Sequence, residues 1–246
     1  MISQCSFRPR RSNWSGGTNI DLSGPGTLVI QECSFEADAS ASGGLMCSVL
    51  SSASRTEILD CRFVDRGTPL ATRISLIWEG IVDGGYQEAL VSRNVFWNMA
   101  GPDSGGPDAL DIHILDGAID VHENTFVRCG VVVANGRVAP PLTFEKNIIA
   151  RGDGRFFVLA GGTLSCNDFW RGQITDLYGR VTQSNNISAD PMFCIEPFGD
   201  VTIAQHSPCA SEYAPTGCGR IGALDPACSP QVIKPTTWGR LKTFFR

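Results

Sequence analysis

Residues 58–67 read ILDCRFVDRG, and the order of residue types in this stretch recurs along the chain of 246 residues. Each copy has a Cys or Asn, here called the anchor, with an apolar residue three positions before it and another two positions after it. The seven anchors are Cys5, Cys33, Cys61, Asn94, Asn124, Asn147 and Asn167. By subtraction, successive anchors lie 28, 28, 33, 30, 23 and 20 residues apart, so each copy is one supersecondary unit with insertions in its loops.

Two columns of this alignment are wholly apolar. The position three residues before the anchor (−3) holds Ile2, Ile30, Ile58, Val91, Val121, Phe144 and Leu164. The position two residues after it (+2) holds Phe7, Phe35, Phe63, Phe96, Phe126, Ile149 and Phe169. Position −5 is mostly small or apolar, so −5 and −3 predict a strand whose alternate side chains face a core.

The position just before the anchor (−1) breaks this alternation. It is charged in five copies, which carry Glu32, Asp60, Arg93, Glu123 and Lys146. Burying an unpaired charge costs several kcal/mol, so these side chains should face solvent. We therefore expect the chain to bend at −1, so that the anchor and the +2 residue point inward again after a corner.

A second apolar run lies between successive anchors, as in GVVVA at residues 130–134 and RFFVLAGG at residues 155–162. Each copy thus contains at least two short strands, which cannot bury their inner face alone. Stacking the copies as parallel strands about 4.8 Å apart buries that face and pairs the backbone. Helical repeats are excluded because the sequence lacks a period of about 3.6 residues and is rich in glycine. Leucine-rich repeats are excluded because their leucine spacing is absent. The pattern predicts an all-β, right-handed parallel β-helix of about seven coils over residues 1–193.

Three roles are open for Cys61: a core packing residue, half of a disulfide to a neighbouring coil, or a reactive thiol. A stacked column of Asn can pass amide hydrogen bonds from coil to coil, and Cys fills the same small buried slot. The packing role is therefore favoured. By the same reasoning, the anchors and the aromatic residues at +2 are predicted core residues.

Composition excludes some classes of partner. There are 25 acidic and 20 basic residues, 42% of the chain is hydrophobic, and no basic stripe with interleaved aromatics is present, so nucleic acid is not an expected partner. No apolar run has the length of a membrane span, and the first residues lack the apolar stretch of a signal peptide. Because the first anchor is already at Cys5, we expect that further coils and an export signal precede Met1, and that the protein is a monomer or part of a longer chain.

The chain has ten cysteines, which is a high number for its length. Residues 194–228 are rich in Pro and Gly and contain Cys194, Cys209, Cys218 and Cys228 without a paired CxxC spacing. This favours disulfides over zinc, and hence a secreted or cell-surface protein. Residues 229–246 form a linker and a basic-aromatic tail. Capping of the solenoid is the favoured role of the tail, beside a disordered extension or a surface-anchoring tag.

Three C-terminal stretches strengthen the pattern: NNISADPMFC at 185–194, GDVTIAQHSPCA at 199–210 and CGRIGALDPAC at 218–228. With the repeat, they resemble secreted bacterial right-handed β-helix proteins of the pectin-lyase-like superfamily, over residues 1–228. The resemblance implies work on carbohydrates, by lyases, hydrolases or non-catalytic adhesins. The chain lacks the Asn-Thr-Asp, Asp-Asp, Gly-His-Gly and Arg-Ile-Lys series of polygalacturonases and the Arg-x-Pro-x-x-Arg stretch of pectate lyases, so it implies no particular reaction.

Residues 103–124 hold the densest group of chemically active side chains. Strand alternation predicts that Asp111, His113, Asp120 and His122 face outward, which makes them candidate catalytic acids and bases. Asp103, Asp108, Asp111 and Asp116 are candidate ligands of a calcium ion, because Ca²⁺ prefers carboxylate oxygens. The alternative is that these are ordinary solvent-facing acids of an acidic protein.

Aromatic residues near the longest insertion are candidate sugar-binding residues, because sugar rings stack on flat aromatic faces. They are Trp78, Tyr86 and Trp97. The alternative for Trp97, which follows Phe96, is packing. The leading hypothesis is a secreted or cell-surface module that binds polysaccharide. The alternatives are a calcium-assisted polysaccharide lyase or glycoside hydrolase, and a structural stalk or adhesin segment.

Overall fold

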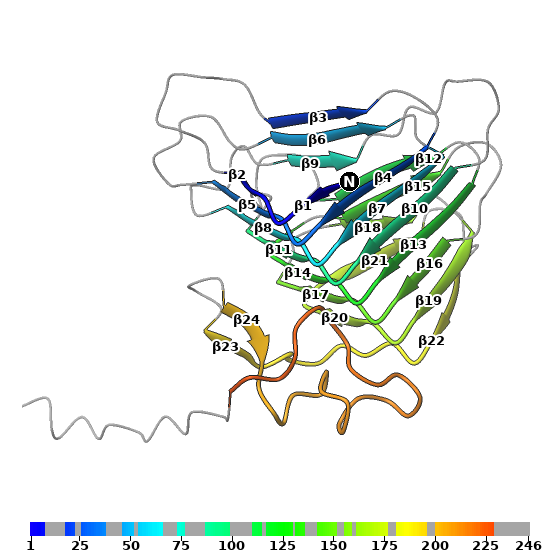
Figure 1. The fold of residues 1–246 in the computed structure, drawn as a ribbon. Coiled ribbons are helices and arrows are strands. Elements are labelled where there is room, and N and C mark those ends of the chain that lie inside the picture. The colour runs from blue at the N-terminus through cyan, green and yellow to red at the C-terminus, as the bar shows by residue number, and fades with distance from the viewer. Residues whose placement is uncertain are drawn as a thin grey trace, which may run out of the picture.

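The structure is a computed structural model that describes residues 1–7, 18–22, 26–37, 46–51, 54–65, 73–76, 87–98, 110–114, 117–129, 131–135, 142–151, 155–158, 161–176, 181–195 and 200–228. Every regular element in these ranges is a β-strand (Figure 1). None of these residues belongs to a helix that is long and apolar enough to cross a membrane.

The strands form three parallel sheets and one short antiparallel pair. The first sheet contains β1 (Ile2–Ser3), β4 (Thr27–Gln31), β7 (Arg55–Leu59), β10 (Gln87–Ser92), β13 (Gly117–His122), β16 (Leu142–Glu145), β19 (Gly162–Ser165) and β22 (Val181–Ser184). The second contains β2 (Ser6–Phe7), β5 (Ser34–Ala37), β8 (Arg62–Asp65), β11 (Val95–Trp97), β14 (Thr125–Val127), β17 (Ile148–Ala150) and β20 (Asp168–Trp170). The third contains β3 (Thr18–Leu22), β6 (Met46–Ser51), β9 (Arg73–Leu76), β12 (Leu110–Ile114), β15 (Val131–Asn135), β18 (Arg155–Val158) and β21 (Gln173–Asp176).

The order of strands shows how the chain winds. Within each of the three sheets, neighbours are three strands apart in the sequence, and the pairs are parallel. One strand from each sheet therefore makes one coil, and the chain completes seven coils before β22 (Figure 1). The predicted all-β parallel β-helix of about seven coils is confirmed. The coils are followed by the antiparallel pair of β23 (Phe193–Ile195) and β24 (Asp200–Ile203).

The strand register aligns the columns that the sequence repeat predicts. Ile30, Ile58 and Val91 are neighbours in the first sheet, as are Val121, Phe144 and Leu164. All six side chains are at most 2% exposed, so the −3 column faces the core. The −5 column lies inside with it and is crowded at Gly162, where a Cβ atom would lie 2.6 Å from the Cβ of Leu142. Only glycine fits at that place in the column.

The predicted bend is a single residue with a left-handed backbone. Every −1 residue from the first copy to an eighth one has φ between 52° and 57°: Gln4, Glu32, Asp60, Arg93, Glu123, Lys146, Cys166 and Asn185. This conformation costs a residue other than glycine about 1–2 kcal/mol. It turns the chain from the first sheet into the second within one residue, and the anchor that follows points into the core.

The Asn anchors form a continuous ladder of hydrogen bonds. The Oδ1 atom of Asn124 accepts from both the backbone N (2.9 Å) and Nδ2 (3.0 Å) of Asn94. Asn147 and Asn167 repeat this arrangement, and Asn186 adds a further rung. The Nδ2 atom of Asn124 also donates to the Val91 carbonyl at 2.8 Å. These buried amide groups are therefore paired, as the stability of a polar core requires.

The Cys anchors pack in the same column. Cys33 and Cys61 are buried, Cys5 is half-buried, and all three are free thiols. Burial raises the pKa of Cys61 to about 12, so this thiol stays protonated at neutral pH. The structure thus places Cys61 in the packing role, without a disulfide to a neighbouring coil.

The +2 residues stack beside the anchors. The rings of Phe35, Phe63, Phe96 and Phe126 lie nearly parallel, with centroids 4.8, 4.9 and 4.6 Å apart along the series. Stacked aromatic pairs contribute about 0.5–1.5 kcal/mol each beyond burial. Ile149 and Phe169 continue the buried column, and the backbone of Phe7 pairs with Phe35 at its other end. The stack therefore runs through the coils in which the anchor is Cys and through those in which it is Asn.

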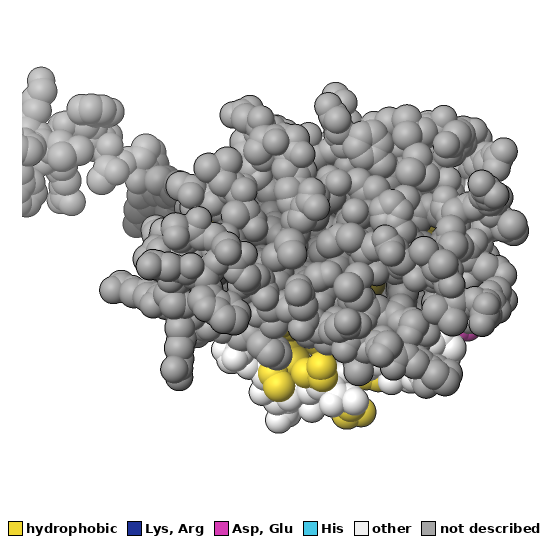
Figure 2. Space-filling model, turned by 90° about the horizontal axis from the view of Figure 1, so that it is seen from above, with side chains coloured by type: hydrophobic (Ala, Val, Ile, Leu, Met, Phe, Trp, Pro, Cys, Tyr) yellow, Lys and Arg dark blue, Asp and Glu magenta, His cyan; other side chains and the backbone are white. Residues whose placement is uncertain are grey.

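The first coil has a neighbouring coil on one side in this structure. Ile2 and Cys5 are partly buried, whereas the matching residues of the next coil, Ile30 and Cys33, are at most 2% exposed. Met1 is 88% exposed. Figure 2 looks onto the molecule from above and shows a small group of hydrophobic side chains (yellow) among the described residues. The inner columns thus become more exposed toward this end of the solenoid.

The C-terminal segment, residues 193–195 and 200–228, packs against the outer side of the second sheet. Val201, Ile203, Ala210 and Ile221 form a second apolar cluster with outward residues of that sheet, including Val127, Ile148, Ala150 and Trp170. Gly222 lies so close that a Cβ atom there would be 2.5 Å from Cδ1 of Ile148. In Figure 1 this segment, in orange, lies at the lower end of the solenoid.

Two disulfides tie the C-terminal segment. Cys194 bonds Cys228 within the segment, with Cα atoms 5.9 Å apart. Cys218 bonds Cys166 at the corner of the seventh coil, with Cα atoms 5.4 Å apart. Cys209, the fourth cysteine for which a disulfide was predicted, is instead a buried free thiol. Its Sγ donates to Oδ2 of Asp168 at 3.1 Å.

Candidate functional site

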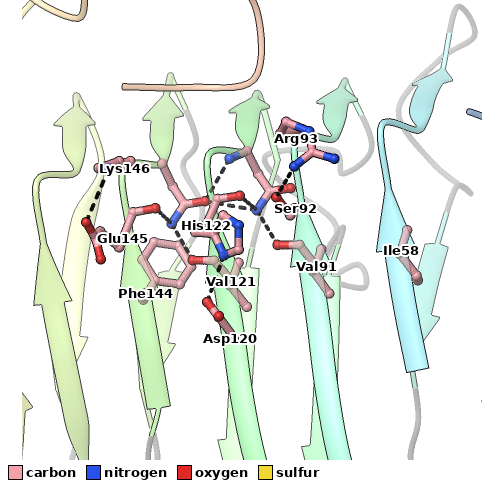
Figure 3. Close-up of polar contacts among 12 residues, drawn as sticks. Ile58, Val91, Ser92, Arg93, Asp120, Val121, His122, Phe144, Glu145 and Lys146 are labelled. Atoms are coloured by element: carbon pink, nitrogen blue, oxygen red, sulfur yellow. Dashed lines mark hydrogen bonds and ion pairs between the residues drawn. The ribbon is translucent and has the colours of Figure 1, made fainter. Parts of the chain in front are cut away.

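The candidate site lies on the outer face of the first sheet, centred on β13. Along this strand the side chains alternate: Ile119 and Val121 are buried, whereas Asp120 and His122 are partly exposed. The Nδ1 atom of His122 lies 2.9 Å from Oδ1 of Asp120, and the two side chains are 31% and 45% exposed (Figure 3). The predicted outward direction of this Asp-His pair is therefore what the structure shows.

Asp120 controls the charge of His122. Its hydrogen bond raises the pKa of His122 above the usual value, while burial acts in the opposite direction. Glu123 raises this pKa further and Arg93 lowers it. The imidazole therefore keeps its proton to a higher pH than a free histidine does, and it stays hydrogen-bonded to Asp120.

Residues on the neighbouring strands extend the polar surface. The register places Glu145 on one side of His122, and on the other side it places Ser92, which is buried. At the corner, Arg93 makes two 2.7 Å hydrogen bonds to the carboxylate of Asp60. Lys146 lies 3.6 Å from the carboxylate of Glu145 (Figure 3). Both signs of charge and several hydrogen-bonding groups thus share one face.

Hydroxyl groups continue this surface toward β22. Thr143, Thr163 and Thr182 are neighbours in the column that contains Asp120. Ser165 and Ser184 follow Glu145 in the column that contains His122. Thr163, Thr182 and Ser184 are exposed. The outer face of the first sheet from β13 to β22, here called the open face, therefore carries two parallel columns of polar side chains spaced by the coil repeat of about 4.8 Å.

The open face can bind a ligand through hydrogen bonds and charge. Hydroxyl, carboxylate and imidazolium groups offer both donors and acceptors to a polar ligand. Among the described residues, no group of three or more His, Cys, Asp and Glu side chains is arranged to hold a metal ion. The predicted calcium ligands Asp103, Asp108 and Asp116 lie outside the described residues, as do Trp78 and Tyr86 and the tail at residues 229–246.

The other Asp-His pair stands on a different sheet. Asp111 and His113 belong to β12, whose backbone pairs with β9 and β15 in the third sheet. Asp120 and His122 belong to β13 in the first sheet. The side chains of Asp111 and His113 are not among those described. The four candidate acids and bases are thus divided between two sheets of the solenoid.

Trp97 is a packed residue. It is 8% exposed and belongs to the apolar cluster between the second sheet and the C-terminal segment. Little of its ring is left for a sugar to stack on. Strand alternation shows that position +3 points away from the solenoid core, but it does not show that another part of the chain covers that position.

A buried acid next to the C-terminal segment was not foreseen from the sequence. Asp168 is 0% exposed and accepts hydrogen bonds from the backbone N of Ala189 (3.0 Å) and from Cys209. Burial raises the pKa of its carboxyl group to about 6. One signal was present in the repeat, because position +1 holds Val95, Thr125 and Ile148 in the preceding coils and an acid only at Asp168.

Comparison of the chain with protein-family models, with curated proteins and with solved structures gives no match. The fold class is therefore established by the strand order and register described above, which are those of a parallel β-solenoid.

Proposed function

We propose that this protein is a secreted or cell-surface module that binds polysaccharide on the open face of its first sheet. The observation that carries the proposal is the pair of polar columns that begins at Asp120 and His122 and continues through the Thr and Ser side chains up to β22. Binding residues that are repeated at a fixed interval suit a ligand that is itself a repeat.

The spacing supports a polysaccharide in particular. The polar groups recur about every 4.8 Å along the solenoid axis, which is comparable to the length of one sugar residue in an extended chain. Each coil can therefore offer one donor or acceptor to each successive sugar. The rigid strands hold these groups in place, so that little side-chain freedom is lost on binding.

Two further features support a location outside the cell. The bonds Cys166–Cys218 and Cys194–Cys228 are of the kind that persists in oxidising compartments. The C-terminal motifs resemble those of secreted bacterial β-helix proteins of the pectin-lyase-like superfamily. Membership of that superfamily is part of the proposal.

The experiment is a binding screen of neutral and uronic-acid polysaccharides, with and without calcium. The test variant combines Asp120→Ala, His122→Ala and Thr163→Val on the open face. The control combines Glu212→Ala, His206→Ala and Thr216→Val, three exposed residues of matching type on the C-terminal segment. We expect the test variant to bind at least about tenfold more weakly, a loss of about 1.4 kcal/mol, and the control to bind like the wild type. Absence of any bound polysaccharide, or equal losses in both variants, would refute the proposal.

The same screen addresses catalysis. The hydrogen bond between Asp120 and His122, with its raised histidine pKa, favours a polysaccharide lyase or glycoside hydrolase as the second candidate function. An unsaturated product or new reducing ends, released by the wild type and not by a His122→Ala variant, would assign a reaction. The third candidate, a structural stalk or adhesin segment, is favoured if neither binding nor product is detected.

A further inference from the structure

A column of arginines lines the second corner of the solenoid, where the chain leaves the second sheet. The fourth residue after the anchor is Arg128, Arg151 and Arg171 in three consecutive coils. All three side chains are exposed, and all three residues have a left-handed backbone with φ of 55°, 52° and 55°. We name these three residues the arginine column.

Backbone hydrogen bonds fix the spacing of the column. The backbone N of Arg128 donates to the carbonyl of Ala150 at 2.9 Å, and that of Arg151 donates to the carbonyl of Trp170 at 3.0 Å. The corners are thus stacked in the same way from coil to coil. Neighbouring guanidinium groups start from backbone positions about 4.8 Å apart, the distance between paired strands.

Trp170 holds two of the three guanidinium groups. The Cζ atoms of Arg151 and Arg171 each lie 4.8 Å from the centroid of its indole ring. Trp170 is 9% exposed and belongs to the apolar cluster that the second sheet forms with the C-terminal segment. A cation that rests on a fixed aromatic ring is oriented before a ligand arrives, so less side-chain freedom is lost on binding.

The chemistry of this column differs from that of the protein as a whole. The chain has a formal net charge of −5, yet here three positive groups follow one another on successive coils. A guanidinium group presents two parallel N–H donors, which match the two oxygens of a carboxylate or a sulfate. A linear polymer with negative groups at regular intervals could engage all three arginines at once, and it would reduce the repulsion among them.

We propose that the arginine column is a binding strip for an extended anionic glycan whose carboxylate or sulfate groups pair with Arg128, Arg151 and Arg171. This inference rests on the proposed glycan-binding function and adds the charge class of the ligand. The strip is distinct from the open face. The open face belongs to the first sheet, whose strands precede those of the second sheet, whereas the arginine column follows the strands of the second sheet. The C-terminal segment covers the outer side of the second sheet between them.

The test compares three dextran-like or pectin-like probes: polygalacturonate for carboxylates, dextran sulfate for sulfates and dextran as the neutral polymer. The test variant combines Arg128→Gln, Arg151→Gln and Arg171→Gln. The control combines Arg55→Gln, Arg62→Gln and Arg220→Gln, which changes the net charge equally at three cations outside both the arginine column and the open face. A second test variant with Lys at the three arginine positions keeps the charge and removes the paired donors.

We expect the Gln variant to lose about tenfold or more in affinity for an anionic probe, the Lys variant to lose less, and the control to lose less than about threefold. Binding by the wild type should weaken as salt is added, because salt screens exposed charges. If the Gln variant loses affinity for polygalacturonate alone, the ligand groups are carboxylates. If it loses affinity for dextran sulfate alone, they are sulfates. If it loses affinity for both probes, the arginines recognise the negative charge that the two share. Each of these results supports the proposal.

Three results would overturn it: no anionic probe bound by the wild type, equal losses in the Gln variant and the control, or equal binding of dextran and the anionic probes. If instead the proposed glycan binding on the open face is wrong, the result differs from all three. In that case the open-face variant binds all glycans as the wild type does, while the arginine variants still lose the anionic probes. Melting curves of all variants show whether they are folded, and the Lys variant retains the test if the Gln variant unfolds.

Discussion

The anchor column is built in two ways along one solenoid. In the first three coils it contains Cys5, Cys33 and Cys61, and in the later coils it contains Asn. In the Cys part, the backbone N of Cys33 reaches the sulfur of Cys61 at 3.4 Å, and the Cys61 thiol donates to the carbonyl of Leu59 at 3.2 Å. In the Asn part, each rung has hydrogen bonds of 2.8–3.1 Å made by amide groups.

This comparison distinguishes two properties of the residue at a coil corner: its size, which fills the slot, and its hydrogen bonds to the neighbouring coils. Both residue types fill a small buried slot, and both offer an acceptor to the backbone N–H of the anchor one coil earlier. Sulfur is a weak acceptor, whereas an amide oxygen is a strong one, and bonded amides in a chain strengthen one another. The two types meet at Cys61, whose backbone N donates to Oδ1 of Asn94 at 2.8 Å. Filling the slot is thus required throughout, and the polar ladder is an additional source of stability in the later coils.

The largest effect is expected from Asn124→Leu. This substitution keeps the size of the side chain but leaves two buried donors of Asn94 without their acceptor, and it removes the donor to the Val91 carbonyl. Each unpaired buried group costs about 1–3 kcal/mol, so for these three groups we expect a loss of about 3–9 kcal/mol in the free energy of unfolding. Urea denaturation measures it. A loss below about 1 kcal/mol would show that the ladder adds no stability beyond packing.

The aromatic stack should not distinguish the two parts. Phe63→Ala in the Cys part and Phe126→Ala in the Asn part each remove a buried, stacked ring, and each should cost about 3–5 kcal/mol. If the two substitutions shift the denaturation midpoint equally, the Cys part and the Asn part differ in stability only through the anchor column. An unchanged midpoint for Phe63→Ala would contradict the alignment of the repeat.

The Asn part also contains a buried acid with a pH-dependent effect. The pKa of Asp168 is about 6 in the folded chain against an ordinary value of 3.8. The folded state therefore holds its proton more tightly than the unfolded state does. The resulting stabilisation is complete below about pH 4 and is lost as the pH rises to about 6, a change of about 3 kcal/mol at 1.36 kcal/mol per pKa unit.

Denaturation midpoints measured between pH 4 and pH 7 test this expectation. An Asp168→Asn variant should lose this part of the pH dependence, because its side chain does not titrate. Glu212→Gln, a change at an exposed acid of the C-terminal segment, should keep it and serves as the control. If Asp168→Asn and the wild type have the same pH profile, the carboxyl group of Asp168 does not titrate as stated.

The smallest effect is expected from Cys61→Asn, which extends the ladder by one rung. The new amide oxygen can accept from the backbone N of Cys33, and its Nδ2 can donate to the Ile30 carbonyl, which the thiol now faces at 3.6 Å. We expect the free energy of unfolding to change by less than about 1 kcal/mol. Calorimetry measures the change, and a loss of several kcal/mol would mean that Cys and Asn are not exchangeable in this column.

Much of the fold follows from the repeat, because stacking forces equivalent residues of successive coils into the same environment. The inward columns, the bend at −1 and the outward Asp120–His122 pair were all predictable from alternation and charge. The last rung, Asn186, was expected at the corner of the last coil but could not be aligned with the other copies, because Gln183 at −3 and Ser188 at +2 replace their apolar residues. Less of the candidate site was predictable. Alternation gives the direction of a side chain, but not the sheet of Asp111 or the cover over Trp97.

The partner of Cys218 also required the structure. Cys166 occupies the −1 position, where the other copies have a polar or charged side chain, and nothing in its local sequence connects it to a residue 52 positions away. The corner presents its side chain to the outside, and the C-terminal segment passes over it there. Cys166 and Cys218 meet at this corner because the C-terminal segment runs back along the outer side of the second sheet.

The left-handed residue at each first corner has a consequence for how such a protein can diversify. Its backbone shape is the same in eight successive copies, whereas its side chain is Gln, Glu, Asp, Arg, Lys, Cys or Asn. Conformation and chemistry are therefore uncoupled at this position. Evolution, or a protein engineer, can rewrite the charge pattern along one edge of the solenoid, one coil at a time, while every inward residue stays as it is.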